Sequence, residues 1–247
     1  MRRLFLSVIA VAFVAGFIST PQASAQQSVN FFIGAFVPRR PDLAGGAISG
    51  PGSRGDDDVL VRNADFLTFD FKEFTGPIVG GGWTVALGDK LDASIDVGFY
   101  QRTSPAIYTE FFHPGGAEIE QDLKLRIIPV TATIRFLPLG HHGPARPYIG
   151  GGVGILSWRY TETGEFLGNA PTPGADIPTF RDTFTEKHVN TGPVILGGVL
   201  IPIGDAGIGG EVRWQSAKGN IPGPPEFSGP KVDLGGWNVL FTVGARF

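Results

Sequence analysis

Apolar and polar residues alternate along eight segments of the chain, and Gly, Pro, Asn or Asp bounds each segment. Alternation with a period of two is typical of β-strands whose two faces lie in different environments. The last segment shows it most fully, because every odd position from Trp237 to Phe247 is apolar or aromatic. The segments predicted as strands are 28–38, 76–87, 91–102, 123–137, 147–160, 188–201, 206–217 and 235–247.

The connections between these segments alternate strictly between long and short. The long ones are 39–75, 103–122, 161–187 and 218–234, and the short ones are 88–90, 138–146 and 202–205. An outer-membrane barrel has short periplasmic turns and long outer loops. The pattern therefore predicts an all-β, eight-stranded antiparallel up-and-down transmembrane β-barrel with both termini in the periplasm. A soluble sandwich also alternates its faces, but it has no reason for this order of loops.

Aromatic residues stand at both ends of the segment PYIGGGVGILSWRY, residues 147–160. Tyr148 and Trp158 share one predicted face, and a tilted strand places them roughly 25 Å apart along the membrane normal. That distance matches the height of a lipid-facing apolar band. We therefore expect Tyr148 and Trp158, together with Trp214 and Trp237, to form an aromatic girdle at the membrane surfaces.

The N-terminus has the features of an export signal. Arg2 and Arg3 precede an apolar run at 4–18, and Ala23-Ser24-Ala25 is a small-residue cleavage site. A membrane anchor is the alternative, but the run is shorter than the roughly 20 residues of a spanning helix. The sequence thus predicts a cleaved signal peptide at 1–25 and one barrel domain at 26–247.

The cysteine content, net charge and hydropathy of the chain exclude several classes of protein. The chain has no cysteine, which excludes a disulfide-stapled secreted scaffold. Its formal net charge of −3 becomes slightly more negative once Arg2 and Arg3 are removed, so nucleic acid is not an expected partner. After the signal no apolar run approaches the length of a transmembrane helix, so any membrane span must consist of strands.

The signal peptide, the eight segments, PYIGGGVGILSWRY and the terminal FTVGARF resemble the outer-membrane β-barrel domain family, which includes the small OmpA-, OmpX- and OmpW-like barrels of Gram-negative bacteria. The resemblance implies a location in the cell outer membrane, contact with its lipid and a monomeric state. It also implies the barrel assembly machinery as a partner, because the C-terminal pattern resembles the signal that this machinery reads: Phe241, Val243, Gly244 and Phe247.

Charged residues lie at inward positions of the predicted strands. Eight strands enclose an interior that side chains just fill, so these charges should pair, with Asp92–Arg135 and Glu211–Arg246 as the expected partners. We expect a salt-bridged plug; a charge-lined pore is the alternative. The predicted lumen charge network consists of Asp92, Asp96, Arg135, Glu211, Arg213 and Arg246.

The expected role is structural or one of surface interaction through the four long loops, with an extracellular ligand that the sequence does not identify. The alternative is a narrow OmpW-like channel for small apolar or ionic solutes. Within the first loop, residues 65–74 (DFLTFDFKEF) alternate, which predicts an upward extension of the second strand; an adhesive aromatic surface is the other interpretation.

Catalysis is not expected. The candidate bases are His113, His141, His142 and His188. None of them stands in a His-x-Ser arrangement like that of the lipid A deacylase barrels. We therefore predict no catalytic residues, no cofactor and no metal. His141–His142 and Asp56–Asp58 are the candidate metal ligands, but a solvated turn and a solvated acidic loop are the favoured interpretations.

The alternation changes parity within residues 123–137. Before Pro129 the apolar residues occupy odd positions, and after it they occupy even ones. A β-bulge at Ile128–Pro129 would absorb one residue and would point both Leu125 and Ile134 outward. The alternative is one regular strand with Lys124 and Arg126 above the membrane and an apolar lower lumen.

Overall fold

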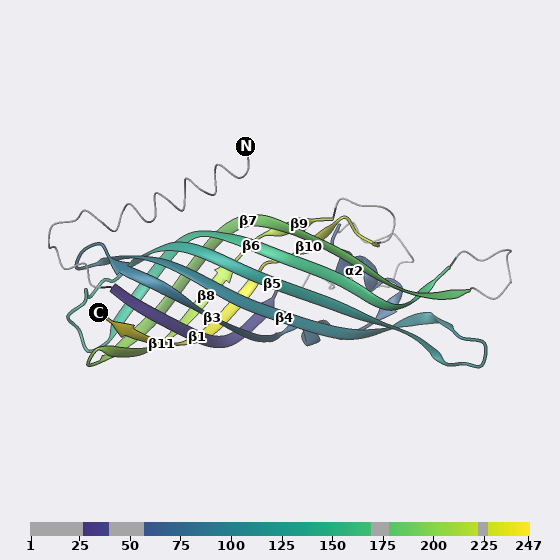
Figure 1. Ribbon diagram of the computed structural model, residues 1–247, viewed down its shortest axis with the longest axis horizontal. Helices are drawn as coiled ribbons and strands as arrows, with labels where there is room; N and C mark the ends of the chain where they lie inside the picture. The colour runs from purple at the N-terminus through teal and green to yellow at the C-terminus, as the bar shows by residue number, and fades with distance from the viewer. Residues whose placement is uncertain (1–26, 40–56, 169–177, 222–226) are drawn as a thin grey trace.

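The computed structural model describes residues 27–39, 57–168, 178–221 and 227–247. Eight long strands form a ring in which each pairs antiparallel with its neighbours, and β1 closes it against β11 (Figure 1). All eight predicted segments are strands, while the predicted signal peptide lies outside the described residues. The strands are β1 (Gln27–Pro38), β3 (Gly76–Ala86), β4 (Leu91–Phe112), β5 (Glu118–Phe136), β6 (Arg146–Leu167), β7 (Thr179–Ile203), β8 (Ala206–Gln215) and β11 (Gly236–Arg246).

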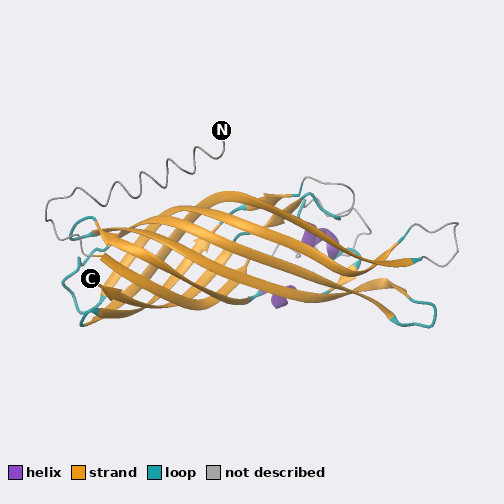
Figure 2. Cartoon of the chain, viewed as in Figure 1, coloured by secondary structure: helices purple, strands orange, loops and turns teal. Residues whose placement is uncertain are grey.

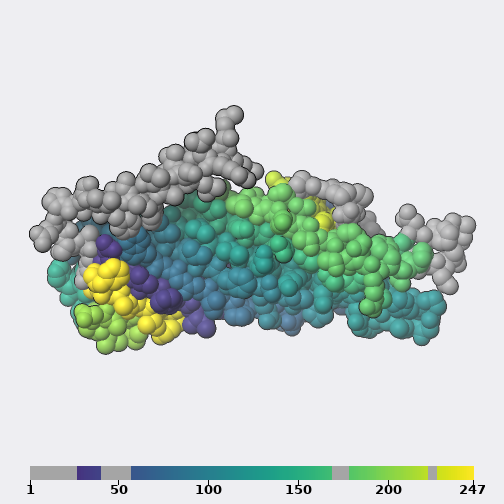
Figure 3. Space-filling view, in the orientation of Figure 1, coloured from purple at the N-terminus to yellow at the C-terminus, as the bar shows by residue number. Residues whose placement is uncertain are grey.

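The strands fall into two length classes. β1, β3, β8 and β11 have 10 to 12 residues, whereas β4 to β7 have 19 to 25. Figure 3 shows the teal and green long strands projecting well beyond the purple and yellow short ones. The predicted loops 103–122 and 161–187 are therefore largely hairpin extensions of the barrel wall. The alternation of apolar and polar residues is harder to recognise in these two loops, because polar residues occupy many outward positions.

Short elements from the other connections lie beside the extended hairpins (Figure 2). They are α2 (Val59–Asn63), β2 (Leu67–Thr68), η1 (Phe71–Phe74), β9 (Lys218–Asn220) and β10 (Lys231–Asp233). Only Leu67 and Thr68 pair with β4, so the predicted strand extension at 65–74 holds for two residues before η1 interrupts it. None of the helices in the described residues is long and apolar enough to cross a membrane.

An apolar belt surrounds the end of the barrel where the short strands lie. Every strand of this wall carries outward apolar side chains that are exposed by 37–69%, which is the surface that lipid covers in a membrane barrel. Inward positions on the same strands include buried polar residues such as Asp96, Thr131, Glu211 and Arg213, beside apolar ones such as Phe32 and Leu240. The belt includes Phe31, Ile33, Val97, Val130, Ile134, Val153, Ile155, Ile195, Val199, Val239 and Phe241.

The polarity of the wall is reversed in the extension. Leu123, Leu125 and Ile127 point inward and are at most 1% exposed, while Lys124 and Arg126 occupy outward positions. The predicted bulge at Ile128–Pro129 is therefore wrong, because β5 alternates continuously and stays in register with β6 from Gln121 to Phe136. The parity changes because the apolar side of the strand changes from lipid outside to a packed core inside, with no slip of the backbone.

Two of the four residues predicted for the aromatic girdle face outward, and the other two do not. Trp237 and Trp214 are paired neighbours on the outer face. Tyr148 and Trp158 point inward and are 8% and 2% exposed. Glycines make room for both rings: a Cβ on Gly198 would lie 2.6 Å from the Tyr148 hydroxyl, and one on Gly219 would lie 2.6 Å from the Trp158 ring.

Candidate functional site: the lumen and its plug

Four buried charges from β4, β5 and β8 form a closed ring across the lumen. The Arg135 guanidinium lies 3.4 Å from Asp96 and 3.2 Å from Glu211. The Arg213 guanidinium bridges the same two carboxylates at 3.2 and 2.7 Å. Each charge thus has two opposite neighbours, and the ring is electrically neutral. We call these four residues the charge ring.

Neutral side chains add two hydrogen bonds to the charge ring. Tyr148 donates its hydroxyl proton to Glu211 Oε2 at 3.0 Å, and Arg213 Nη1 donates to Thr131 Oγ1 at 3.0 Å. A buried charge needs this support, because an uncompensated one costs several kcal/mol. The ring therefore crosses the barrel as a rigid polar layer with little freedom to separate.

The predicted lumen charges lie inward, but their partners differ from those expected. Asp92 is opposite Arg135 in register, yet its carboxylate lies 3.0 Å from His141 Nε2. Glu211 forms its ion pairs with Arg135 and Arg213, and Arg246 lines the cavity below them. Asp92 and Arg135 are opposite each other in register, but Glu211 is opposite Leu240, which is six positions from Arg246 along β11, so Glu211 and Arg246 are too far apart to pair.

A cavity of about 70 Å³ lies next to the charge ring at the end with the short turns. Buried side-chain nitrogens of Arg135 and Arg146 lie beside this region without a hydrogen-bond partner among the described residues. The volume is enough for several water molecules, which are the usual partners of such groups. Sequence reasoning missed Arg146 and His141 here, because both lie in or beside a predicted turn.

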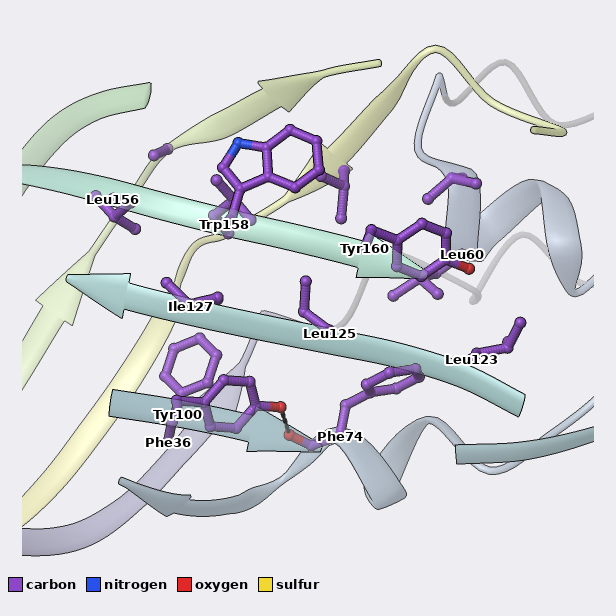
Figure 4. Packing of buried hydrophobic residues seen from close by; sticks show 14 of the residues in the cluster. Phe36, Leu60, Phe74, Tyr100, Leu123, Leu125, Ile127, Leu156, Trp158 and Tyr160 are labelled. Carbon is purple, nitrogen blue, oxygen red and sulfur yellow. Dashed lines mark hydrogen bonds between the residues drawn. The ribbon is translucent and has the colours of Figure 1, made fainter. Parts of the chain in front are cut away.

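An apolar plug fills the lumen on the other side of the charge ring (Figure 4). The barrel wall contributes side chains such as Tyr100, Leu125 and Trp158, and the Tyr100 hydroxyl donates to the carbonyl of Phe74. The connecting segments contribute the rest of this packing. We define the plug as the residues of these segments that are at most 4% exposed in this cluster: Val59, Leu60, Leu67, Phe74, Val232 and Leu234.

A buried polar cluster attaches α2 to the wall. Asn63 Nδ2 donates to Glu162 Oε1 at 2.7 Å and to the Tyr160 hydroxyl at 3.1 Å, and Tyr160 donates to the same carboxylate at 2.8 Å. Burial raises the pKa of Glu162, while the donors from Asn63 and Tyr160 oppose that shift. Because all these groups are paired, the contact fixes α2 in one orientation.

The acidic segment before α2 is structural. Asp58 is 7% exposed and caps the helix by accepting from Leu60 N–H at 2.9 Å. Burial raises the pKa of Asp58 to about 6, against the effect of backbone donors from Asp233 and Leu60. Asp57 pairs with Lys231 Nζ at 2.8 Å. The expected solvated acidic loop is therefore wrong for Asp58, whereas Asp57 is half exposed and Asp56 lies outside the described residues.

The histidines are dispersed over the molecule. His113 Nε2 lies 2.6 Å from Glu165, and His188 Nε2 lies 2.7 Å from Glu186. His141 contacts Asp92, and His142 lies 3.0 Å from Asp89. Across the described part of the chain, no three His, Asp or Glu side chains gather in a way that would hold a metal ion.

Comparison with known proteins identifies the fold. No protein-family model matches the sequence, and no curated protein matches it significantly. The structure is similar to the outer membrane protein OprG from Pseudomonas aeruginosa, with 14% identity, a TM-score of 0.50, and 90% of this chain and 96% of that chain covered. Neisserial surface protein A has 12% identity and a TM-score of 0.44, with 92% and 100% covered. The fold is that of small outer-membrane β-barrels, and fold and belt together indicate the outer membrane.

Proposed function

We propose that this outer-membrane barrel is closed to solutes and acts, without catalysis, in a structural or surface-interaction role through its projecting half. The observation that carries the proposal is the plug: connecting segments fold back into the lumen and bury Val59, Leu60 and Phe74 there. A channel would need those segments to line a path. Here they pack against wall residues that are themselves buried.

The charge ring supports closure independently. A solute entering through the cavity near Asp92 first meets Arg135 and Glu211, whose contacts span the lumen at 3.2 Å. Separating them would leave buried charges without partners, which is strongly unfavourable. Plug and ring therefore stand in series, and both would have to open for passage.

The orientation follows from the same division. We place the extended hairpins β4–β5 and β6–β7 outside the cell, and the short turns and both chain ends of the barrel in the periplasm. Gln27 and Phe247 lie together at the short-turn end, where Phe247 N–H donates to the Gln27 carbonyl at 3.0 Å. The signal peptide at 1–25, monomeric insertion and reading of Phe241, Val243, Gly244 and Phe247 by the barrel assembly machinery remain parts of this proposal.

Conductance in planar lipid bilayers tests closure. The wild-type barrel should show no step-like openings. In a double variant, residues 57–66 are replaced by a short Gly-Ser linker and Arg213 by Ala. This variant should show step-like openings, because both the plug and the charge ring are then weakened. A barrel with 113–117 replaced by Asn-Gly is the control, because this hairpin tip contributes no residue to the plug or the charge ring. Steady openings of the wild type would favour the narrow channel.

A binding screen tests the surface role. Cells that display the wild type are compared with cells that display the 113–117 variant and with cells lacking the barrel. Host-cell surfaces, polysaccharides and immobilised proteins serve as targets. Retention that requires the hairpin tip would support surface interaction, and equal retention by cells without the barrel would argue against it.

A further inference from the structure

Charges on the outer face of the extension are sorted by height above the belt. In one row across neighbouring strands, Arg126 of β5 is paired with Arg159 of β6, and Arg159 is paired with Lys187 of β7. Gln101 of β4 continues the row on the other side of Arg126. We call Arg126, Arg159 and Lys187 the basic row.

The belt begins directly beneath the basic row. The next outward position on β5, β6 and β7 is Ile128, Ser157 and Val189, which are paired across the strands, and Val189 is 61% exposed. Val130 and Ile155 follow below. The basic row therefore marks the boundary between the apolar wall and the polar wall, which is where lipid headgroups lie in a membrane.

The barrel itself does not neutralise the basic row. Strands in a sheet are about 4.8 Å apart, so like charges in register destabilise one another. Among the residues that the structure describes, no ion pair involves Arg126, Arg159 or Lys187, and the buried Arg159 Nε has no hydrogen-bond partner. The first outward acid above Arg126 on β5 is Asp122, four residues or roughly 13 Å along the strand.

We propose that the basic row binds the phosphate groups of a phosphorylated lipid in the outer leaflet, whose acyl chains lie along Val130, Ile155 and Val189. Three cations in register favour an anion with several oxygens, and Arg suits phosphate because its guanidinium donates two parallel hydrogen bonds. The continuous apolar surface below selects an amphiphile over a free ion. This inference rests on the proposed orientation, with the extended hairpins outside the cell.

Lipid titration into the purified full-length barrel in detergent tests the site. The probes are diphosphorylated lipid A, the same lipid with its phosphates removed, and inorganic phosphate. Arg126→Gln/Arg159→Gln/Lys187→Gln should weaken binding of the phosphorylated lipid on the order of 100-fold, from about 1 kcal/mol for each charge near a membrane surface. Binding of the dephosphorylated lipid should not change.

Lys72→Gln/Lys90→Gln/Lys218→Gln is the matched control, because it removes the same charge from exposed positions outside the basic row. An equal loss of affinity in the control, or no loss in the row variant, would overturn the proposal. So would saturation of the row by inorganic phosphate in preference to the lipid. The bilayer conductance assay reports separately on closure, so failure of the lipid site and failure of the proposed function are distinguishable.

Discussion

The belt half and the projecting half of this barrel are built from the same strands with opposite polarity. On β6, Val153 faces outward in the belt, whereas Trp158 and Tyr160 face inward within the extension. On β5, Ile134 is 49% exposed in the belt, whereas Leu125 is 1% exposed within the extension. The same hydrogen-bonded strands thus pass from a region surrounded by lipid into a region surrounded by water. The apolar side of a strand is set by what surrounds it at that height, and the hydrogen-bonded register is unaffected.

The largest effect is expected where the belt half encloses charge. Glu211→Ala should lower the free energy of unfolding by about 3–5 kcal/mol, because Arg135 and Arg213 would then share Asp96 alone. Urea titration in lipid vesicles, followed by tryptophan fluorescence, measures this. The double variant Glu211→Ala/Arg213→Ala should cost less than the sum of the single variants. Strict additivity would mean that the two side chains do not interact.

The next largest difference is expected when a large apolar side chain is truncated in each half. Leu125→Ala should cost about 2–5 kcal/mol, since the removed methyl groups leave a cavity inside the extension. Ile134→Ala on the belt should cost clearly less, because lipid can occupy the space that a surface side chain leaves. The same urea titration compares them. Equal costs would contradict the view that the extension has a packed interior and the belt a fluid exterior.

Charge insertion on one strand locates the boundary between the halves. Val153→Arg should cost about 2–4 kcal/mol, because its outward position lies in the apolar belt. Thr163→Arg, at an exposed outward position of the same strand within the extension, should change stability by less than about 0.5 kcal/mol. The fraction of barrel that folds into vesicles reports both. A large cost at Thr163 would place the lipid boundary higher than the basic row.

The smallest effect should appear as a pH dependence of the plug. The folded-state pKa of Asp58 is raised from 3.8 to about 6, so the folded form binds more protons than the unfolded form between about pH 4 and 6. The stability of the α2 contact is therefore greatest below pH 4, falls as pH rises to about 6 and is flat above that. The change is at most about 3 kcal/mol.

Hydrogen exchange at residues 59–63, corrected for intrinsic rates, measures this change. Asp58→Asn/Glu162→Gln should remove the dependence, because the raised pKa of Glu162 acts in the same direction. A slope of the opposite sign would show that these carboxyls ionise more readily when folded than when unfolded.

Much of the fold was predictable, because period-two alternation and turn residues are local. All eight strands, their order and the antiparallel closure follow from the segments bounded by Gly, Pro, Asn and Asp. The inward placement of Asp96, Arg135, Glu211 and Arg213 also follows, since a strand of known parity sorts its side chains between two faces.

The site was predictable only in part, because its contacts are non-local. Arg213 and Thr131 are 82 residues apart in sequence, and Asn63 meets Glu162 across 99 residues. The local sequence around each of these residues does not indicate which distant residue it contacts. The ring pairing differed from the predicted one for this reason, and the roles of Asp57 and Asp58 as plug anchors were missed.

The sequence by itself determined a closed sheet of eight strands with a belt, because those features need only the alternation along each strand. Tertiary structure alone decided which side of each strand is buried in the extension. Leu125 and Tyr148 point inward because the plug and the charge ring supply neighbours there. Burial depends on what occupies the space beside a face, and that space is filled by segments distant in the chain.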